Sequence, residues 1–215
     1  MMEESSIINI SKKISGNTAV WPGDSAVQIE TMMSTSAGDI VNLTTLRFSA
    51  HTASHADAPY HVTDKGETID QLNLQPYWGL AQVITVNKTD GPMLPEDFVE
   101  YDLSLAPRVL VRTPVGQFTY DRFPDKIPYP SPELSNFLKK AGIILYGTDA
   151  PSMDAIDSED LPGHQAMIKN KIAILEGLDL NLANDGLYEL SALPLNIVGG
   201  DGSPVRAALR RLNEF

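Results

Sequence analysis

The pattern of apolar and polar residues along the chain predicts short strands with two helices among them. Apolar and β-branched residues are concentrated in nine segments: 7–10, 27–33, 40–49, 81–86, 108–112, 143–146, 172–175, 187–198 and 205–209. The segments at 81–86 and 108–112 are short apolar runs between polar stretches, which is typical of strands buried inside a sheet.

The clearest helix signal begins at Ser131. Ser131 suits the N-cap position, Pro132 the first helical position and Glu133 the first turn, whereas lysines and then Gly142 follow where a helix should end. A second, shorter helical pattern runs over residues 164–169. Because the first helix leads directly into the strand at 143–146, the order of elements favours the α/β class.

Length and composition indicate one soluble domain over residues 1–215. A chain of 215 residues buries about 70% of its unfolded surface, and it has no low-complexity linker or internal repeat. The formal net charge is −12 without a basic stripe, which disfavours nucleic acid and anionic membranes as partners and favours a small molecule.

The chain also carries no recognisable targeting signal. Acidic residues occupy the N-terminus, where a secretory signal would be basic, and no apolar stretch reaches about 18 residues. There is no cysteine, so disulfides and thiolate metal sites are excluded. These features together predict a cytoplasmic protein.

Four residues suited to metal binding or acid–base chemistry are concentrated within residues 50–62. This stretch, A-H-T-A-S-H-A-D-A-P-Y-H-V, holds three of the chain's four histidines, His51, His55 and His61, together with Asp57. Histidine is the commonest metal ligand and titrates near neutral pH. A lone histidine is most often a core residue, but this cluster favours a metal or acid–base site.

The spacing of these residues excludes a straight strand. Fully extended, His51 and Asp57 would lie roughly 20 Å apart, whereas two ligands of one zinc ion must each reach within about 2.0–2.2 Å of it. The spacing of His51 and His55 suits a helical turn or a tight loop, and Pro59 disfavours helix before it. We therefore expect a curled loop that presents all three ligands to one point.

Two later residues, His164 and Glu176, extend the ligand set. The five candidate ligands are then His51, His55, Asp57, His164 and Glu176. Five exceed what one zinc ion with a bound water needs, whereas two metal ions that share carboxylates would use them all. His61 is left over, and an acid–base role suits it.

Trp21 stands beside the turn signal Pro22-Gly23, and its position leaves two interpretations open. A tryptophan there could fill the core, or it could form a rigid aromatic wall at a pocket. The residues alone slightly favour the core.

The stretch H-T-A-S-H-A-D-A-P-Y-H resembles the H-x-G-T-H-x-D-x-P-x-H signature of the metal-dependent cyclase hydrolases, and is most similar to the bacterial kynurenine formamidases. The resemblance covers nearly the whole chain. Its other motifs are W-P-G-D at 21–24, T-D-A-P-S-M-D at 148–154, His164 with Glu176 twelve residues later, and D-G-S-P-V-R-A at 201–207.

The resemblance implies a single-domain swivelling β/β/α fold, a homodimer and two zinc ions per subunit, with manganese or another divalent metal as the alternative. By motif position, His51, His55 and Asp57 would hold the first ion. Asp57, His164 and Glu176 would hold the second, with Glu176 also reaching the first. His61 matches the family's proton donor and acceptor. Trp21 matches its substrate-contacting tryptophan, which reverses the core interpretation.

The implied activity is that of an arylformamidase, which hydrolyses N-formyl-L-kynurenine to L-kynurenine and formate during tryptophan degradation. The substrate has an aryl ring, which Trp21 could face, and an amino-acid tail, for which Tyr60, Asp24, Arg206 and Ser203 are candidate partners. Isatin hydrolases and other amidases or lactonases of the family share the ligand pattern and remain alternatives. A non-enzymatic metal- or ligand-binding module is a third, although such a module would not need His61.

One departure from the signature is visible. Ala53-Ser54 stands where the signature has Gly-Thr. The ligands are unaffected, so the departure concerns the shape of the loop and the place of the chain within the family.

Overall fold

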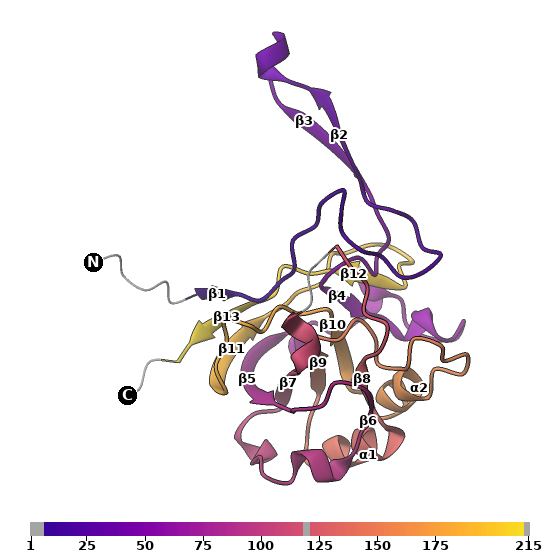
Figure 1. Cartoon of the computed structure of the whole chain (residues 1–215), viewed down its shortest axis with the longest axis vertical. Coiled ribbons are helices and arrows are strands. Elements are labelled where there is room, and N and C mark those ends of the chain that lie inside the picture. The colour runs from indigo at the N-terminus through magenta and orange to yellow at the C-terminus, as the bar shows by residue number, and fades with distance from the viewer. Residues whose placement is uncertain (1–6, 118–120, 213–215) are drawn as a thin grey trace.

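The protein is built on a curled nine-stranded sheet, and the computed structural model describes residues 7–117 and 121–212 (Figure 1). The strand order is β1-β13-β11-β5-β7-β9-β10-β4-β12. The central strands β5, β7, β9 and β10 are parallel neighbours, whereas the pairings toward both edges are antiparallel. This mixed sheet with helices confirms the predicted α/β class.

The strands of this sheet are β1 (Ile7–Asn9), β4 (His55–Asp57), β5 (Trp78–Thr85), β7 (Arg108–Arg112), β9 (Leu145–Thr148), β10 (Ala173–Glu176), β11 (Gly186–Ser191), β12 (Gly202–Pro204) and β13 (Ala208–Arg211). Two smaller sheets pair β2 (Gln28–Met33) with β3 (Leu43–Arg47) and β6 (Gly91–Met93) with β8 (Pro128–Pro130). The two α-helices are α1 (Pro132–Lys140) and α2 (Pro162–Lys169).

The parallel strands carry a core on each face because their successive side chains point to opposite sides. On β7, Leu110 joins one apolar cluster, while Val109 and Val111 join the other. The second cluster also contains Leu134 and other residues of α1 and α2, so these helices cover that face. The predicted buried strand at 108–112 is thereby confirmed.

Helix α1 follows its sequence signals closely. The Ser131 hydroxyl accepts a hydrogen bond from the main-chain N–H of Leu134 at 3.1 Å, which satisfies a donor that the first turn leaves unpaired. Pro132 occupies the first turn, and Lys139 and Lys140 occupy the last.

None of the described helices is both long and apolar enough to cross a membrane.

Strands β2 and β3 form a two-stranded arm that projects away from the body of the protein (Figure 1). Neither strand contains a buried residue. The strands predicted at 27–33 and 40–49 both exist, the second only as Leu43–Arg47. Apart from the buried Val27, their large apolar side chains belong to this arm rather than to the core.

Other sequence predictions need correction. The strand predicted at 187–198 ends at Ser191, since Pro194 has no N–H to donate to a sheet. The strand predicted at 205–209 begins only at Ala208, because the N–H of Val205 is bonded to Ser54 and that of Ala207 to Ser11. The three-residue strands β4, β6, β8 and β12 were missed, being too short to show a period.

Candidate metal centre and active site

Strand β4 carries two of the candidate ligands on one face. His55 and Asp57 are two residues apart, so their side chains point to the same side of the sheet. Antiparallel pairing with β10 places Glu176 directly opposite His55. The expected curled loop is therefore correct for His51 to Ser54, but the following ligands lie on a short strand, which gives them a rigid base.

The turn before β4 explains the Ala53-Ser54 departure. Ala53 has φ +60°, a left-handed conformation that favours glycine. This conformation aims its carbonyl at His55, whose Nδ1–H donates to it at 3.1 Å and leaves Nε2 free as a ligand. The Ser54 hydroxyl donates to Gly177 at 2.6 Å, a bond that a threonine hydroxyl could also make. Ala53 therefore adopts, with some strain, a conformation that suits the glycine of the signature.

The N-terminus of α2 places His164 against the same carboxylates. Asp154 accepts hydrogen bonds from the main-chain N–H groups of Gly163 and His164, and from His164 Nδ1 at 2.7 Å. A carboxylate is favoured at a helix N-terminus by the helix dipole. Asp154 therefore fixes the ring so that His164 Nε2 points toward Asp57 and Glu176, at 3.3 and 3.2 Å.

The carboxylates of Asp57 and Glu176 each lie between His164 on one side and histidines of the first cluster on the other. Asp57 Oδ1 lies 2.9 Å from His51 Nδ1 and 3.4 Å from His55 Nε2, while its Oδ2 faces His164 Nε2. Glu176 Oε2 lies 3.2 Å from His55 Nε2, and its Oε1 faces His164 Nε2. Two clusters that could each hold an ion, His51-His55-Asp57 and Asp57-His164-Glu176, therefore share a carboxylate.

The chemistry of these atoms fits metal ions. Two ligand atoms bound tetrahedrally to one zinc ion lie about 3.3–3.6 Å apart, close to the separations of most nitrogen and oxygen pairs here. Both oxygens of Asp57 and Oε1 of Glu176 are buried, and the imidazole nitrogens beside them are not oriented to form hydrogen bonds with them. Buried charged oxygens need a partner, and a shared cation would supply it.

The electrostatics of the cluster also favour a cation. Burial would raise the pKa of Asp57, but the imidazoles of His164, His51 and His55 hold it well below its usual range. Burial would likewise lower the pKa of His51, yet Asp57 and Asp201 outweigh burial and raise it to about 9. The carboxylates thus stay ionised and stabilise positive charge beside them.

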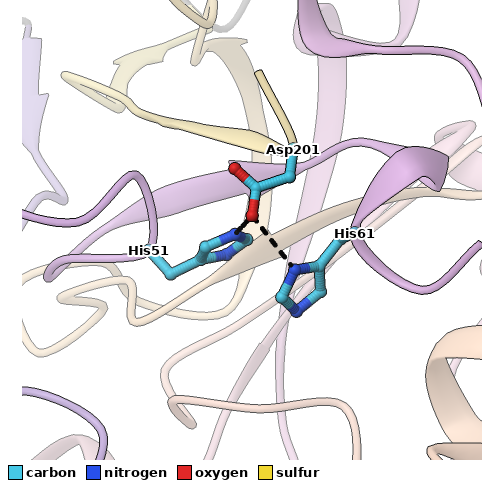
Figure 2. Close-up of side chains that lie close together, drawn as sticks. All are labelled: His51, His61 and Asp201. Atoms are coloured by element: carbon cyan, nitrogen blue, oxygen red, sulfur yellow. Dashed lines mark hydrogen bonds and ion pairs between the residues drawn. The ribbon is translucent and has the colours of Figure 1, made fainter. Parts of the chain in front are cut away.

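His61 lies next to the cluster without facing its carboxylates. Its ring centroid is 4.0 Å from that of His51, and its Nδ1 lies 3.6 Å from Asp201 Oδ2, which also accepts from His51 Nε2 at 3.1 Å (Figure 2). Burial lowers the pKa of His61, so its imidazole is neutral near pH 7. A neutral imidazole can accept and return a proton, and the nearby Asp201 carboxylate would stabilise its protonated form.

A cavity of about 600 Å³ opens over these side chains. Trp21 and Phe123 form part of its wall, with ring centroids 5.2 Å apart in an edge-to-face arrangement. Trp21 is only half-buried and belongs to none of the apolar core clusters of the described residues. The size suits a drug-sized ligand, and the wall suits an aromatic one.

All five candidate ligands predicted from the sequence come together, and His61 and Trp21 line the same cavity. Two supporting residues, Asp154 and Asp201, were not singled out. Each bonds the second nitrogen of a candidate ligand, His164 or His51, and such partners fix the orientation and tautomer of metal-binding histidines. Their signal was present, because both lie in motifs of the resemblance.

Known proteins are similar to this chain in sequence and in fold. Residues 8–155 match the family model Cyclase, described as "Putative cyclase". A kynurenine formamidase of Salinibacter ruber is 45% identical over 205 residues, which cover 95% of this chain and 97% of the relative.

Solved structures agree on the fold. A potential metal-dependent hydrolase with cyclase activity superposes with a TM-score of 0.82 at 22% identity, covering 96% of this chain and 98% of that one. An isatin hydrolase bound to the product analogue thioisatinate superposes with a TM-score of 0.81 at 20% identity, covering 94% and 91%. These likenesses show a common fold, and together with the family match and the 45% identical relative they establish that the chain belongs to the cyclase family.

Proposed function

We propose that this protein is an arylformamidase that hydrolyses N-formyl-L-kynurenine to L-kynurenine and formate. The observation that carries the proposal is the pair of clusters joined by Asp57 at the floor of a cavity with an aromatic wall. The 45% identical kynurenine formamidase supports the choice of substrate. The isatin hydrolase is 20% identical and supports the fold alone.

The donor set suits two divalent ions, and we assign zinc to both sites. His51, His55 and Asp57 would hold one ion and Asp57, His164 and Glu176 the other, with Glu176 Oε2 also beside His55. Imidazole and carboxylate ligands also suit manganese and other divalent metals. When bound, such ions supply the Lewis acidity that ionises water near neutral pH and stabilises negative charge on a carbonyl oxygen.

The side chains of the cavity would transfer the proton and orient the substrate. Water adds to the formyl carbon, the bond between this carbon and the aryl nitrogen breaks, and one proton must reach the departing nitrogen. His61 lines the cavity beside the cluster and is neutral near pH 7, so it can take this proton and deliver it. Trp21 and Phe123 can hold the aryl ring while the apolar wall excludes bulk water.

A side-by-side assay tests this function. At one pH and with zinc supplied, we expect kcat/KM for N-formyl-L-kynurenine to exceed that for isatin and for formanilide by at least about two orders of magnitude, because a site built for a polar group rejects analogues without it. Comparable rates for both formamides would indicate a general arylformamidase, and a preference for isatin would refute the proposal. A chelated protein with full activity would exclude the metal centre.

We further propose that the protein is a homodimer in which the β2–β3 arm contacts the second copy. The arm exposes six large apolar side chains: Ile29, Met32, Ile40, Val41, Leu43 and Leu46. A lone two-stranded hairpin is marginally stable in water, so covering this surface would stabilise it. Light scattering should find a dimer. It should find a monomer for the double variant Ile29→Glu, Leu46→Glu. These two residues face each other across β2 and β3, so the variant places two charges in the exposed apolar surface.

A further inference from the structure

The cavity wall contains a charged residue that the proposed reaction leaves unassigned. Of the lysines and arginines in the described parts of the chain, only Lys12 and Arg122 line the cavity. Arg122 is 74% exposed and its guanidinium is paired with Asp125 at 3.3 Å. Lys12 is half-buried, and within the described residues it has no carboxylate at ion-pair distance.

The position of Lys12 is fixed at both ends of the residue. Its main-chain N–H donates to the Ser54 hydroxyl at 2.9 Å, next to the candidate ligand His55. Its Nζ donates to the main-chain carbonyl of Asp149 at 3.3 Å, just before the cavity residue Pro151. Lys12 therefore lies in the cavity wall between the turn that leads to the candidate ligand His55 and the segment that leads to Pro151.

The ammonium group of Lys12 retains unused hydrogen-bonding capacity. An ammonium has three donors, and the described structure accounts for one of them, in the bond to Asp149. The Asp149 carboxylate is itself occupied, because it accepts from the Thr113 N–H at 2.6 Å and from the Thr113 hydroxyl at 2.7 Å. Burial lowers the pKa of Lys12, and the charges of Asp149 and Asp179 offset this only in part. An anionic ligand would offset more of the lost hydration.

The residues that the sequence suggested for the substrate's tail are less well placed. Arg206 Nε donates to Asn9, and Arg206 does not line the cavity. Ser203 is buried, and its hydroxyl is bonded to Leu195 and Pro204. Tyr60 lies outside the cavity, and Asp24 lines it but carries the wrong charge for a carboxylate.

We propose that Lys12 binds the carboxylate of the substrate's amino-acid tail and makes the cavity selective for formylated aryl amines that carry this group. The inference rests on the proposed function and names the part of the substrate that the metal centre and Trp21 do not recognise. A hydrogen bond between two charged groups contributes an amount equivalent to about 10–100-fold in binding, which is more than a neutral hydrogen bond contributes.

The test compares two substrates that differ only in the carboxylate: N-formyl-L-kynurenine and its decarboxylated analogue, which keeps the formamide, the ring and the amine. For the wild type we expect kcat/KM to be about 10–100-fold higher with the carboxylate present. Lys12→Gln should abolish this preference, mainly by raising KM for N-formyl-L-kynurenine, and leave the analogue within about twofold. Glutamine keeps an N–H for the Asp149 carbonyl, so the variant isolates the charge.

Two variants serve as controls. Lys13→Gln removes the same charge from an exposed neighbour outside the cavity and should leave the preference intact. If Arg122→Gln abolishes the preference and Lys12→Gln does not, the proposal is wrong. An equal loss with both substrates would make Lys12 a structural residue and would also overturn it.

A measurement on the wild type alone keeps the proposal testable if the Lys12 variants do not fold. As competitive inhibitors, L-kynurenine should bind about 10–100-fold more tightly than its decarboxylated analogue, and equal inhibition constants would refute the carboxylate site. If the wild type hydrolyses neither formamide, the proposed function itself fails. If it hydrolyses both equally, only the role of Lys12 fails.

Discussion

The imidazole rings of His51 and His61 lie 4.0 Å apart, yet only His51 faces the carboxylate shared by the two ligand clusters. Both rings approach the same oxygen of Asp201 (Figure 2). Two neighbouring histidines are thereby placed for different tasks. His51 can contribute to a metal site, and His61 can exchange protons with a ligand in the cavity.

His61→Ala should separate these tasks. We expect the variant to keep its metal content and lose roughly 10²–10⁴-fold in kcat, the usual contribution of a positioned acid–base group. His51→Ala is the control and should lose metal. Elemental analysis beside steady-state kinetics measures both quantities, and metal loss from His61→Ala in proportion to activity would make His61 a ligand.

Glu176→Gln tests whether one carboxylate serves both clusters. Its two oxygens lie 3.2 Å from the nitrogens of His164 and His55, and an amide offers one neutral oxygen in place of two charged ones. We expect the wild type to hold about two ions per chain and the variant to lose affinity at both sites. Glu159→Gln makes the same change at the cavity wall and should retain both.

Much of this centre could be predicted from the sequence because it contains all four histidines of the chain, three of them within eleven positions. The grouping of His51, His55 and Asp57 was visible as spacing, whereas His164 and Glu176 were weak signals singly and entered as the further ligands that two metal ions would use. Lys12 gave no signal at all. Its proximity to the cavity arises from a pairing with Ser54 across 42 positions of sequence, which no local pattern reports.

Strands were likewise predictable only where a local pattern specified them. Strand β7 was predicted with its observed bounds because an apolar run buried on both faces is a local property. Strand β4 was missed, since its three residues form a strand only through pairing with β10 and β12. The apolar arm was indistinguishable from core strands, because sequence shows that a residue is apolar but not what covers it.

Trp21→Ala should impair binding rather than folding. The ring is half-buried in the cavity wall against Phe123, so we expect KM to rise about 5–30-fold, in keeping with the contribution of an aromatic contact. The melting temperature should change little. The other tryptophan, Trp78, is 55% exposed and lies outside the cavity, so Trp78→Ala should leave KM unchanged. A large fall in melting temperature with normal KM would contradict the cavity role.

Ala53→Gly should stabilise the protein. A left-handed conformation costs an ordinary residue about 1–2 kcal/mol. Glycine avoids this strain, but it loses more conformational entropy on folding, which cancels part of the gain. We expect a net gain of about 0.5–1 kcal/mol in the free energy of unfolding, or roughly 1–4 °C in melting temperature. Ala58→Gly, at φ −94°, should destabilise instead. A fall in stability for Ala53→Gly would show that the turn is not strained.

Asp149→Asn should change how stability depends on pH. Asp149 is fully buried, and burial raises its pKa from 3.8 to about 6 despite the hydrogen bonds from Thr113. A raised pKa in the folded state favours the protonated form, so this contribution to stability is complete below about pH 4 and is lost as pH rises through 6. The difference of about two units corresponds to about 3 kcal/mol.

The asparagine variant does not titrate at this position and can still pair with both Thr113 groups, its Oδ1 accepting the N–H and its amide donating to the hydroxyl. Metal-site groups titrate in both proteins, so their effects cancel in the difference. Relative to the wild type, the free energy of unfolding of Asp149→Asn should therefore rise by about 2 kcal/mol between pH 4 and pH 7, because part of the full effect is already lost at pH 4. Urea unfolding at intervals over this range measures it. Parallel profiles for the two proteins would mean that the buried carboxyl has an ordinary pKa, held down by Thr113 and by the nearby charge of Lys12.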